Sequence, residues 1–112
     1  MNKEDLSSRK CRACEGFADK LKPAEIKENL SNISGWTVKD NKLYNEYKFK
    51  DFKSALEFVN ILGKIAEQEG HHPNISFTWG KVEVAIYTHA VNGLTLNDFI
   101  LAAKFDKIKY VP

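Results

Sequence analysis

Apolar residues recur along this chain with two periods, which predict helices and strands in a definite order. Spacings of three and four residues are typical of an amphipathic helix, and alternation with a period of two is typical of a half-buried strand. A short helix is expected from Pro23, because the first turn of a helix does not need the N–H that proline lacks, and it should end at Ser34-Gly35. Its apolar face consists of Ile26, Leu30 and Ile33.

Two hairpins are predicted, one before and one after a long helix. The first turns at Asp40-Asn41, between strands at residues 36–39 and 43–49. The second turns at Gly80-Lys81. The alternating apolar residues are Leu43, Tyr47 and Phe49 in the first hairpin, and Ile75, Phe77, Trp79, Val82, Val84 and Ile86 in the second. Each hairpin should therefore bury one face of its strands.

The long helix between the hairpins carries more apolar surface than one contact needs. Asp51 can cap its start, and Gly70, which readily adopts a left-handed conformation, can end it. One apolar stripe is expected to face the sheet: Phe52, Ala55, Leu56, Val59, Leu62 and Ala66. A second stripe is then surplus, and part of it is expected to be buried against a partner. This second stripe consists of Phe58, Ile61 and Ile65.

A last helix is predicted from Thr95, where Asp98 three residues later completes a capping-box pattern. Its buried stripe is expected to consist of Leu96, Phe99, Ile100 and Ala103. The resulting order of elements is αββαββα. Hairpins separated by helices indicate a four-stranded antiparallel sheet with three helices packed on one face, which is the α+β class.

Length and composition are those of one small domain. The chain has 112 residues, 43% of them hydrophobic, and a formal net charge of +2 with basic and acidic residues interspersed. Such a chain has no electrostatic footprint for nucleic acid or an anionic membrane. No apolar run reaches the roughly 18 residues of a membrane span, and residues 1–10 lack a signal-peptide core, so we expect a cytoplasmic protein. A domain this small gains stability by pairing with another copy.

We expect residues 1–19 to form a polar N-terminal tail and residues 20–112 to form the single folded domain. The tail contains the only two cysteines, Cys11 and Cys14, in a C-x-x-C pattern. This spacing suits a redox pair or half of a zinc site, but a structural zinc needs four ligands and the chain has no second pair. A pair without a function is the third interpretation, and the sequence leaves all three open.

All three histidines of the chain gather where the long helix and the last strand end. His71 and His72 lie between Gly70 and Pro73, so the backbone there can let both rings converge with His89. The rings can satisfy local hydrogen bonds, hold a zinc ion with a water as fourth ligand, or act as acid and base. Adjacent ligands suit zinc poorly, and a helical H-E-x-x-H spacing is absent.

These histidines are part of a longer pattern of spaced residues. It runs Glu67-x-x-x-His71-His72-Pro73, followed by Trp79, His89 and Asp98. Three further segments accompany it: Phe49-Lys50-Asp51-Phe52, Thr88-His89 and Gly93-Leu94-Thr95. Together they resemble the signature of the pterin-4a-carbinolamine dehydratases, and the resemblance covers residues 36–105.

The resemblance implies an antiparallel sheet with three helices, a homodimer or homotetramer, and an active site of His71, His72 and His89. The implied reaction converts a 4a-hydroxytetrahydropterin to the quinonoid dihydropterin, in tetrahydrobiopterin recycling. A ring nitrogen loses a proton, and hydroxide leaves as water. Imidazole has an unperturbed pKa of about 6.5 and can give or take a proton near neutral pH. We therefore expect a hydro-lyase that needs no metal and no organic cofactor.

The resemblance also implies residues that contact the substrate. Tyr87 and Thr88, beside His89, would line the pterin pocket, while Glu67 and Asp98 would orient the rings or bind the pterin edge. Helix capping is an alternative role for Asp98. Simple exposure on the polar side of the long helix is an alternative for Glu67.

Two positions depart from the family pattern. Gly70 stands where many relatives have Asp or Asn before the histidine pair, and Ala90 follows His89 where an acid is common. We expect both positions to border the substrate, with water or backbone groups in place of the missing side chains. Affinity would then change without loss of the imidazole chemistry.

A binding role is the alternative from a different class. Animal members of the family also act as dimerisation cofactors for a homeodomain transcription factor. This chain has no basic segment and no element that would recognise a DNA sequence. Its second apolar stripe could bind a helical partner as well as another copy.

Overall fold

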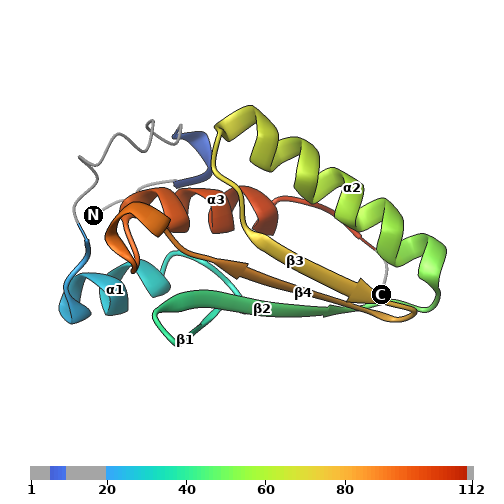
Figure 1. The fold of residues 1–112 in the computed structure, drawn as a ribbon, viewed down its shortest axis with the longest axis horizontal. Helices are drawn as coiled ribbons and strands as arrows, with labels where there is room; N and C mark the ends of the chain where they lie inside the picture. The colour runs from blue at the N-terminus through green and yellow to red at the C-terminus, as the bar shows by residue number, and fades with distance from the viewer. Residues whose placement is uncertain (1–5, 10–19, 111–112) are drawn as a thin grey trace.

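In the computed structural model, which describes residues 6–9 and 20–110, helices and hairpins follow one another as the sequence predicts. The elements are the 3-10 turn η1 (Leu6–Ser8), α1 (Pro23–Leu30), β1 (Thr37–Lys39), β2 (Lys42–Lys48), α2 (Phe52–Glu69), β3 (Asn74–Thr78), β4 (Lys81–Ile86), the 3-10 turn η2 (His89–Val91) and α3 (Leu96–Asp106). The strands form one antiparallel sheet in the order β1-β2-β4-β3. Figure 1 shows α2 and α3 lying across one face of this sheet, and the α+β prediction is confirmed.

The first hairpin depends on its two turn residues. Asp40 and Asn41 have φ values of 53° and 62°, both in the left-handed region. Two successive left-handed residues are typical of the type I′ turn, whose twist matches that of the flanking strands. Asp and Asn adopt this conformation more readily than most residues with a side chain. The β1–β2 pairing therefore starts directly at the turn, with Lys39 opposite Lys42.

The two hairpins join through the β2–β4 pair, which runs the length of both strands. Leu43 lies opposite Ile86 and Tyr47 lies opposite Val82, and all four side chains are buried under the helices. The alternation predicted for the second hairpin fails at one position. Trp79 lies in the turn after β3 and is 65% exposed, because the strand ends one residue earlier.

Helix α2 begins and ends where the capping signals predict. The Ser54 N–H donates to Asp51 Oδ1 over 2.7 Å, and Gly70 has a left-handed φ of 64° at the C-cap. Hydrogen bonds from Ser54 lower the pKa of the Asp51 carboxyl. The cap is therefore strongest when Asp51 is ionised, as it is at neutral pH.

The face of α2 that meets the core agrees only in part with the prediction. Phe52 and Leu56, which were expected against the sheet, are 48% and 39% exposed, whereas Phe58 from the surplus stripe is 2% exposed. The buried residues of the helix are Ala55, Phe58, Leu62 and Ala66. Both predicted stripes have spacings of three and four residues, so the period alone could not distinguish them. Ala55, Leu62 and Ala66 of the first stripe are buried as predicted, and tertiary packing adds Phe58 to them and leaves Phe52 and Leu56 outside.

Aromatic packing accounts for the burial of Phe58. Its ring centroid lies 4.6 Å from that of Tyr47, 5.1 Å from that of Phe49 and 5.0 Å from that of Tyr110. Aromatic pairs at these separations stabilise a core beyond the area that they bury. The cluster joins α2 to β2 and to the segment after α3.

Helix α3 is buried around most of its circumference. Of the predicted stripe, Phe99, Ile100 and Ala103 are buried and Leu96 is half-buried. Further buried apolar residues are Leu101, Ala102 and Phe105. A helix that is apolar on nearly every side requires neighbours on nearly every side.

One of the neighbours of α3 is the N-terminal turn η1. Leu6 belongs to the core and is 3% exposed, and Lys104 Nζ donates to the Ser7 carbonyl over 2.8 Å. Lys104 Nζ also lies 3.8 Å from Glu69 Oε2, at the end of α2. Lys104 thus links η1, α2 and α3. Cys11 and Cys14 lie outside the described residues, so their predicted roles stay open.

Replacing Phe58 should test the assigned face of α2. We expect Phe58→Ala to lower the free energy of unfolding by about 3–5 kcal/mol, because it leaves a cavity in the aromatic cluster. Ile61→Ala is the matched control, since Ile61 lies on the same helix and is 43% exposed, and it should cost about 1 kcal/mol or less. Chemical denaturation measures both values, and equal losses would contradict this orientation of α2.

Candidate active site

The first predicted histidine lies in a buried hydrogen bond between two helices. The left-handed Gly70 ends α2 and lets the chain turn, while the His71 N–H donates to the Ala66 carbonyl over 3.2 Å. The His71 ring then reaches the first turn of α3, where Nε2 lies 2.5 Å from Asp98 Oδ1. His71 is 5% exposed and Asp98 is fully buried. A carboxylate bound to one ring nitrogen fixes both the orientation and the tautomer of an imidazole.

The second carboxylate oxygen of Asp98 is also occupied. The Thr88 hydroxyl donates to Asp98 Oδ2 over 2.9 Å, and the Thr95 N–H donates to the same oxygen over 2.8 Å. The hydroxyl oxygens of Thr88 and Thr95 are 2.9 Å apart, and both residues are 1% exposed. The predicted capping-box role of Asp98 is therefore confirmed on the Thr95 side, and the same carboxylate also binds His71.

The second histidine forms a pair with a carboxylate at the surface. His72 Nε2 lies 2.7 Å from Glu67 Oε1, and their side chains are 65% and 79% exposed. Glu67 belongs to the last turn of α2, so this pair bridges the helix end. The adjacent residues His71 and His72 thus have carboxylate partners in opposite environments.

The third histidine begins the turn η2, just beyond the last strand. The His89 ring centroid lies 4.2 Å from that of Tyr87, with the planes tilted by 50°. On the Tyr87 ring, Lys42 Nζ lies 4.7 Å from the centroid. His89 is exposed, and Tyr87 is half-buried. This group presents an imidazole and an aromatic surface to solvent, with a cation beside them.

The predicted site residues therefore fall into three groups. These are His71 with Asp98 and Thr88, His72 with Glu67, and His89 with Tyr87. Gly70 and Ala90 are exposed beside the histidines that they adjoin in sequence. Thr88 does not have the environment expected of a pocket-lining side chain, because its hydroxyl faces Asp98 inside the fold.

Two partners of these groups escaped the sequence reasoning. The sequence predicts Thr95 only as a helix cap. Its position three residues before Asp98 was the signal that it also contacts the carboxylate that holds His71. Lys42 carries no signal by itself. Its place beside Tyr87 follows from the pairing of Leu43 with Ile86, which only a known register supplies.

Other features of the described residues bear on binding. In residues 6–9 and 20–110, no three His, Cys, Asp or Glu side chains are grouped so that they could hold a metal ion. The helices in these residues include none that is both long and apolar enough to span a membrane.

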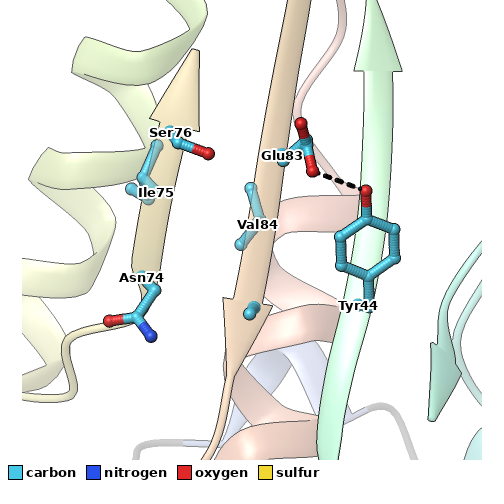
Figure 2. A pocket seen from close by; sticks show the side chains of 7 residues that line it. Tyr44, Asn74, Ile75, Ser76, Glu83 and Val84 are labelled. Atoms are coloured by element: carbon cyan, nitrogen blue, oxygen red, sulfur yellow. Dashed lines mark hydrogen bonds between the residues drawn. The ribbon is translucent and has the colours of Figure 1, made fainter. Parts of the chain in front are cut away.

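A separate hollow lies on the open face of the sheet, away from the helices (Figure 2). Its volume is about 170 Å³, and Tyr44, Glu83, Asn74 and Ser76 line it with polar groups. The Tyr44 hydroxyl donates to Glu83 Oε2 over 2.8 Å, which raises the pKa of Tyr44 to about 12. None of the predicted site residues lines this hollow.

Comparison with known proteins supplies the family. The family model described as pterin 4 alpha carbinolamine dehydratase matches residues 19–108, which include every histidine. This chain belongs to that family. The resemblance inferred from the histidine pattern is thereby confirmed.

Relatives of this dehydratase family member cover nearly its whole length. A protein of Rickettsia canadensis (strain McKiel), provisionally named a pterin-4-alpha-carbinolamine dehydratase, is 48% identical over 103 residues, which cover 90% of this chain and 94% of the relative. The crystal structure of a transcriptional coactivator/pterin dehydratase from Brucella melitensis matches with a TM-score of 0.73 and 32% identity, over 78% of this chain and 95% of that one.

A second solved structure broadens the range of roles found on this fold. It is a pterin dehydratase-like protein identified as a RuBisCO assembly factor in the alpha-carboxysome. Its TM-score is 0.52 and its identity is 25%, over 63% of this chain and 82% of that chain. The names of these structural neighbours include both dehydration and roles in assembly or coactivation.

The contrast between the two histidine–carboxylate pairs of this dehydratase family member should appear in stability. Asp98→Ala should lower the free energy of unfolding by about 3–5 kcal/mol, because it removes the buried carboxylate that His71, the Thr88 hydroxyl and the Thr95 N–H share. Glu67→Ala breaks the exposed pair and should cost about 1 kcal/mol at most. Urea denaturation of both variants decides this, and a larger loss for Glu67→Ala would contradict the assigned environments.

Proposed function

We propose that this protein dehydrates a 4a-hydroxytetrahydropterin to the quinonoid dihydropterin by acid and base catalysis from His71, His72 and His89. The observation that carries the proposal is the pairing of two adjacent histidines with carboxylates, on the fold of a dehydratase family. We further propose that it acts in the cytoplasm, in the recycling of tetrahydrobiopterin, for which family membership is the support.

The reaction needs two proton transfers and no change in oxidation state overall. The bond from C4a to the hydroxyl oxygen breaks, a ring nitrogen loses a proton, and the departing hydroxide gains one to leave as water. One imidazole can take the first proton while another gives the second, since an imidazole side chain can serve as either an acid or a base. We propose that no metal or organic cofactor takes part.

Exposure suggests how the three histidines divide the work. His72 and His89 are exposed, so their rings can reach a bound pterin directly. The His71 ring is held by Asp98 and is almost wholly buried, so its contribution depends on the position that this pair gives it. In this proposal Glu67 holds the His72 ring in one orientation, and Asp98 does the same for His71.

Substrate binding is assigned to the surface around these rings. The Tyr87 ring, packed on His89, offers a flat apolar surface on which a pterin can stack. Gly70 and Ala90 leave the approach to the histidines open, because neither carries a large side chain. We propose that backbone groups at these two positions contact the pterin.

Turnover by histidine variants tests the mechanism. We expect His72→Ala and His89→Ala each to lower kcat by about 100-fold or more, which is typical of the loss of a positioned acid or base. The measurement follows the decay of freshly generated 4a-hydroxytetrahydropterin, with the buffer rate subtracted. Lys27→Ala, at an exposed position on α1, is the control and should keep the full rate.

Three results would contradict this proposal. Wild-type protein that adds nothing to the buffer rate would remove the dehydratase function. Near-normal kcat in both histidine variants, with unchanged circular dichroism, would remove the histidine mechanism. Loss of activity after dialysis against a strong chelator, with recovery on addition of zinc, would replace the proposal with a metal-dependent one.

We also propose that the protein forms a homodimer or homotetramer, now through a corrected surface of α2. Phe58 cannot be part of it because this residue is buried, but Phe52 and Leu56, one turn apart on the same side of α2, are 48% and 39% exposed. Exposed apolar residues on one helix favour association. The same residues would serve the alternative binding role, as a cofactor for another protein, which the names of the structural neighbours support.

Light scattering tests the self-association. We expect wild-type protein at micromolar concentration to have at least twice the monomer mass, and Leu56→Glu to shift it toward the monomer by placing a charge in the apolar surface. Lys27→Glu changes charge on α1 instead and should leave the mass unchanged. A strictly monomeric wild type would remove the oligomer proposal. Binding of a different protein that is lost in Leu56→Glu would favour the binding role.

A further inference from the structure

Two buried threonine hydroxyls surround the carboxylate that holds His71, and the mechanism above gives them no task. Thr88 and Thr95 are each 1% exposed, and their hydroxyl oxygens lie 2.9 Å from each other. Burying a hydroxyl is costly unless it is hydrogen-bonded, and here both hydroxyls are bonded in a chain that ends on Asp98. The arrangement therefore points to a role at that carboxylate.

The contacts of Asp98 show what this arrangement controls. A carboxylate can rotate about the bond to its Cβ, and this rotation decides where each oxygen points. Oδ2 accepts hydrogen bonds from the Thr88 hydroxyl at 2.9 Å and from the Thr95 N–H at 2.8 Å. With Oδ2 held from two directions, Oδ1 is directed at His71 Nε2. The Thr88 hydroxyl thus influences the orientation of the His71 ring through two successive hydrogen bonds, one to Asp98 and one between Asp98 and the ring.

Thr88 also connects the buried pair to the exposed third histidine. Its backbone N–H donates to the Gly93 carbonyl over 2.9 Å, and the Gly93 N–H returns a bond to the Thr88 carbonyl over 3.4 Å. These bonds close the loop that contains the turn η2 and His89. Tyr87 and His89 flank Thr88 in sequence, and their rings contact each other. One residue therefore fixes the orientation of His71 and the base of the loop that carries His89.

We propose that Thr88 and Thr95 are positioning residues for the reaction, with Thr88 acting on His71 through Asp98 and Thr95 supporting the Thr88 hydroxyl. This inference rests on the proposed dehydration and gives the Thr88 side chain a task other than lining the pterin pocket. A side chain that is 1% exposed, with its hydroxyl engaged by Asp98 and Thr95, has no surface left for a substrate.

The proposal separates chemistry from binding. Loss of the Thr88 hydroxyl leaves only the Thr95 N–H to hold Asp98 Oδ2, so the carboxylate rotates more easily and His71 is held in its working orientation for a smaller fraction of the time. The pterin surface around Tyr87 and His89 is unchanged by that loss. We therefore expect kcat to fall while KM stays nearly constant, whereas loss of a substrate contact would raise KM.

A pair of substitutions at one position provides the test. Thr88→Val keeps the shape of the side chain and removes the hydroxyl, and we expect kcat to fall about three- to tenfold, as for the loss of one hydrogen bond. Thr88→Ser keeps the hydroxyl and should regain most of that loss. Thr95→Val should act in the same direction. The double variant Thr88→Val/Thr95→Val should lose less than the product of the single effects, because the Thr95 hydroxyl acts on Asp98 only through the Thr88 hydroxyl.

A spectroscopic measurement keeps this test independent of turnover. The proton in the short hydrogen bond between His71 and Asp98 should give a strongly downfield NMR signal in the wild type. We expect Thr88→Val to shift or broaden this signal and Thr88→Ser to restore it, while thermal unfolding shows that all variants are folded at the temperature used. A purely structural threonine would change the melting temperature and leave the signal in place.

Each outcome decides one of the two claims. A wild type without activity removes the proposed function, and the His71 signal then decides alone whether Thr88 positions the ring. An active wild type with unchanged kcat in Thr88→Val overturns the positioning role. A rise in KM alone overturns it in favour of a substrate contact, and failure of Thr88→Ser to recover turnover overturns it as well.

Discussion

The Asp98 carboxylate is the interaction on which the arrangement of the candidate site depends. It is fully buried, and its partners come from three segments: the exit of α2 with His71, the end of β4 with Thr88, and the start of α3 with Thr95. Burying a carboxylate without such partners would be prohibitively costly. The folded state therefore requires the three segments to meet. The contacts that satisfy Asp98 are also the ones that orient His71 and anchor the loop of His89.

Two neighbouring residues show how burial separates structure from reactivity. His71 and His72 each pair with a carboxylate, yet one pair is buried and the other is largely exposed. A hydrogen bond to a charged group is stronger where water is excluded, so the buried pair holds its geometry. The exposed pair competes with water and can rearrange around a ligand. The left-handed Gly70 makes this division possible, because it turns the chain sharply enough for consecutive rings to point into different environments.

Local signals predicted the order of elements, and they failed where only tertiary contacts decide. The Asp51 cap, the Gly70 stop and the Asp40-Asn41 turn depend on nearby backbone, so the sequence contains them in full. The buried face of α2 follows the predicted stripe only in part, since Ala55, Leu62 and Ala66 are buried as expected but aromatic packing also buries Phe58. The site divides in the same way. The histidine pattern indicated the family. The alternation of Val82, Val84 and Ile86 also places Thr88 on the buried face, but its contact with Asp98 depends on the tertiary fold.

Helix α2 carries the proposed catalytic surface and the proposed association surface at opposite ends. Its 18 residues span about 27 Å at the usual rise per residue. The histidines follow its last turn, whereas the exposed Phe52 and Leu56 lie in its first two turns, at the opposite end. A partner bound there would leave the approach to His72 and His89 open. Because the two surfaces share no residue, substitutions in one can leave the other intact, which accords with the different roles named for structural neighbours of this chain.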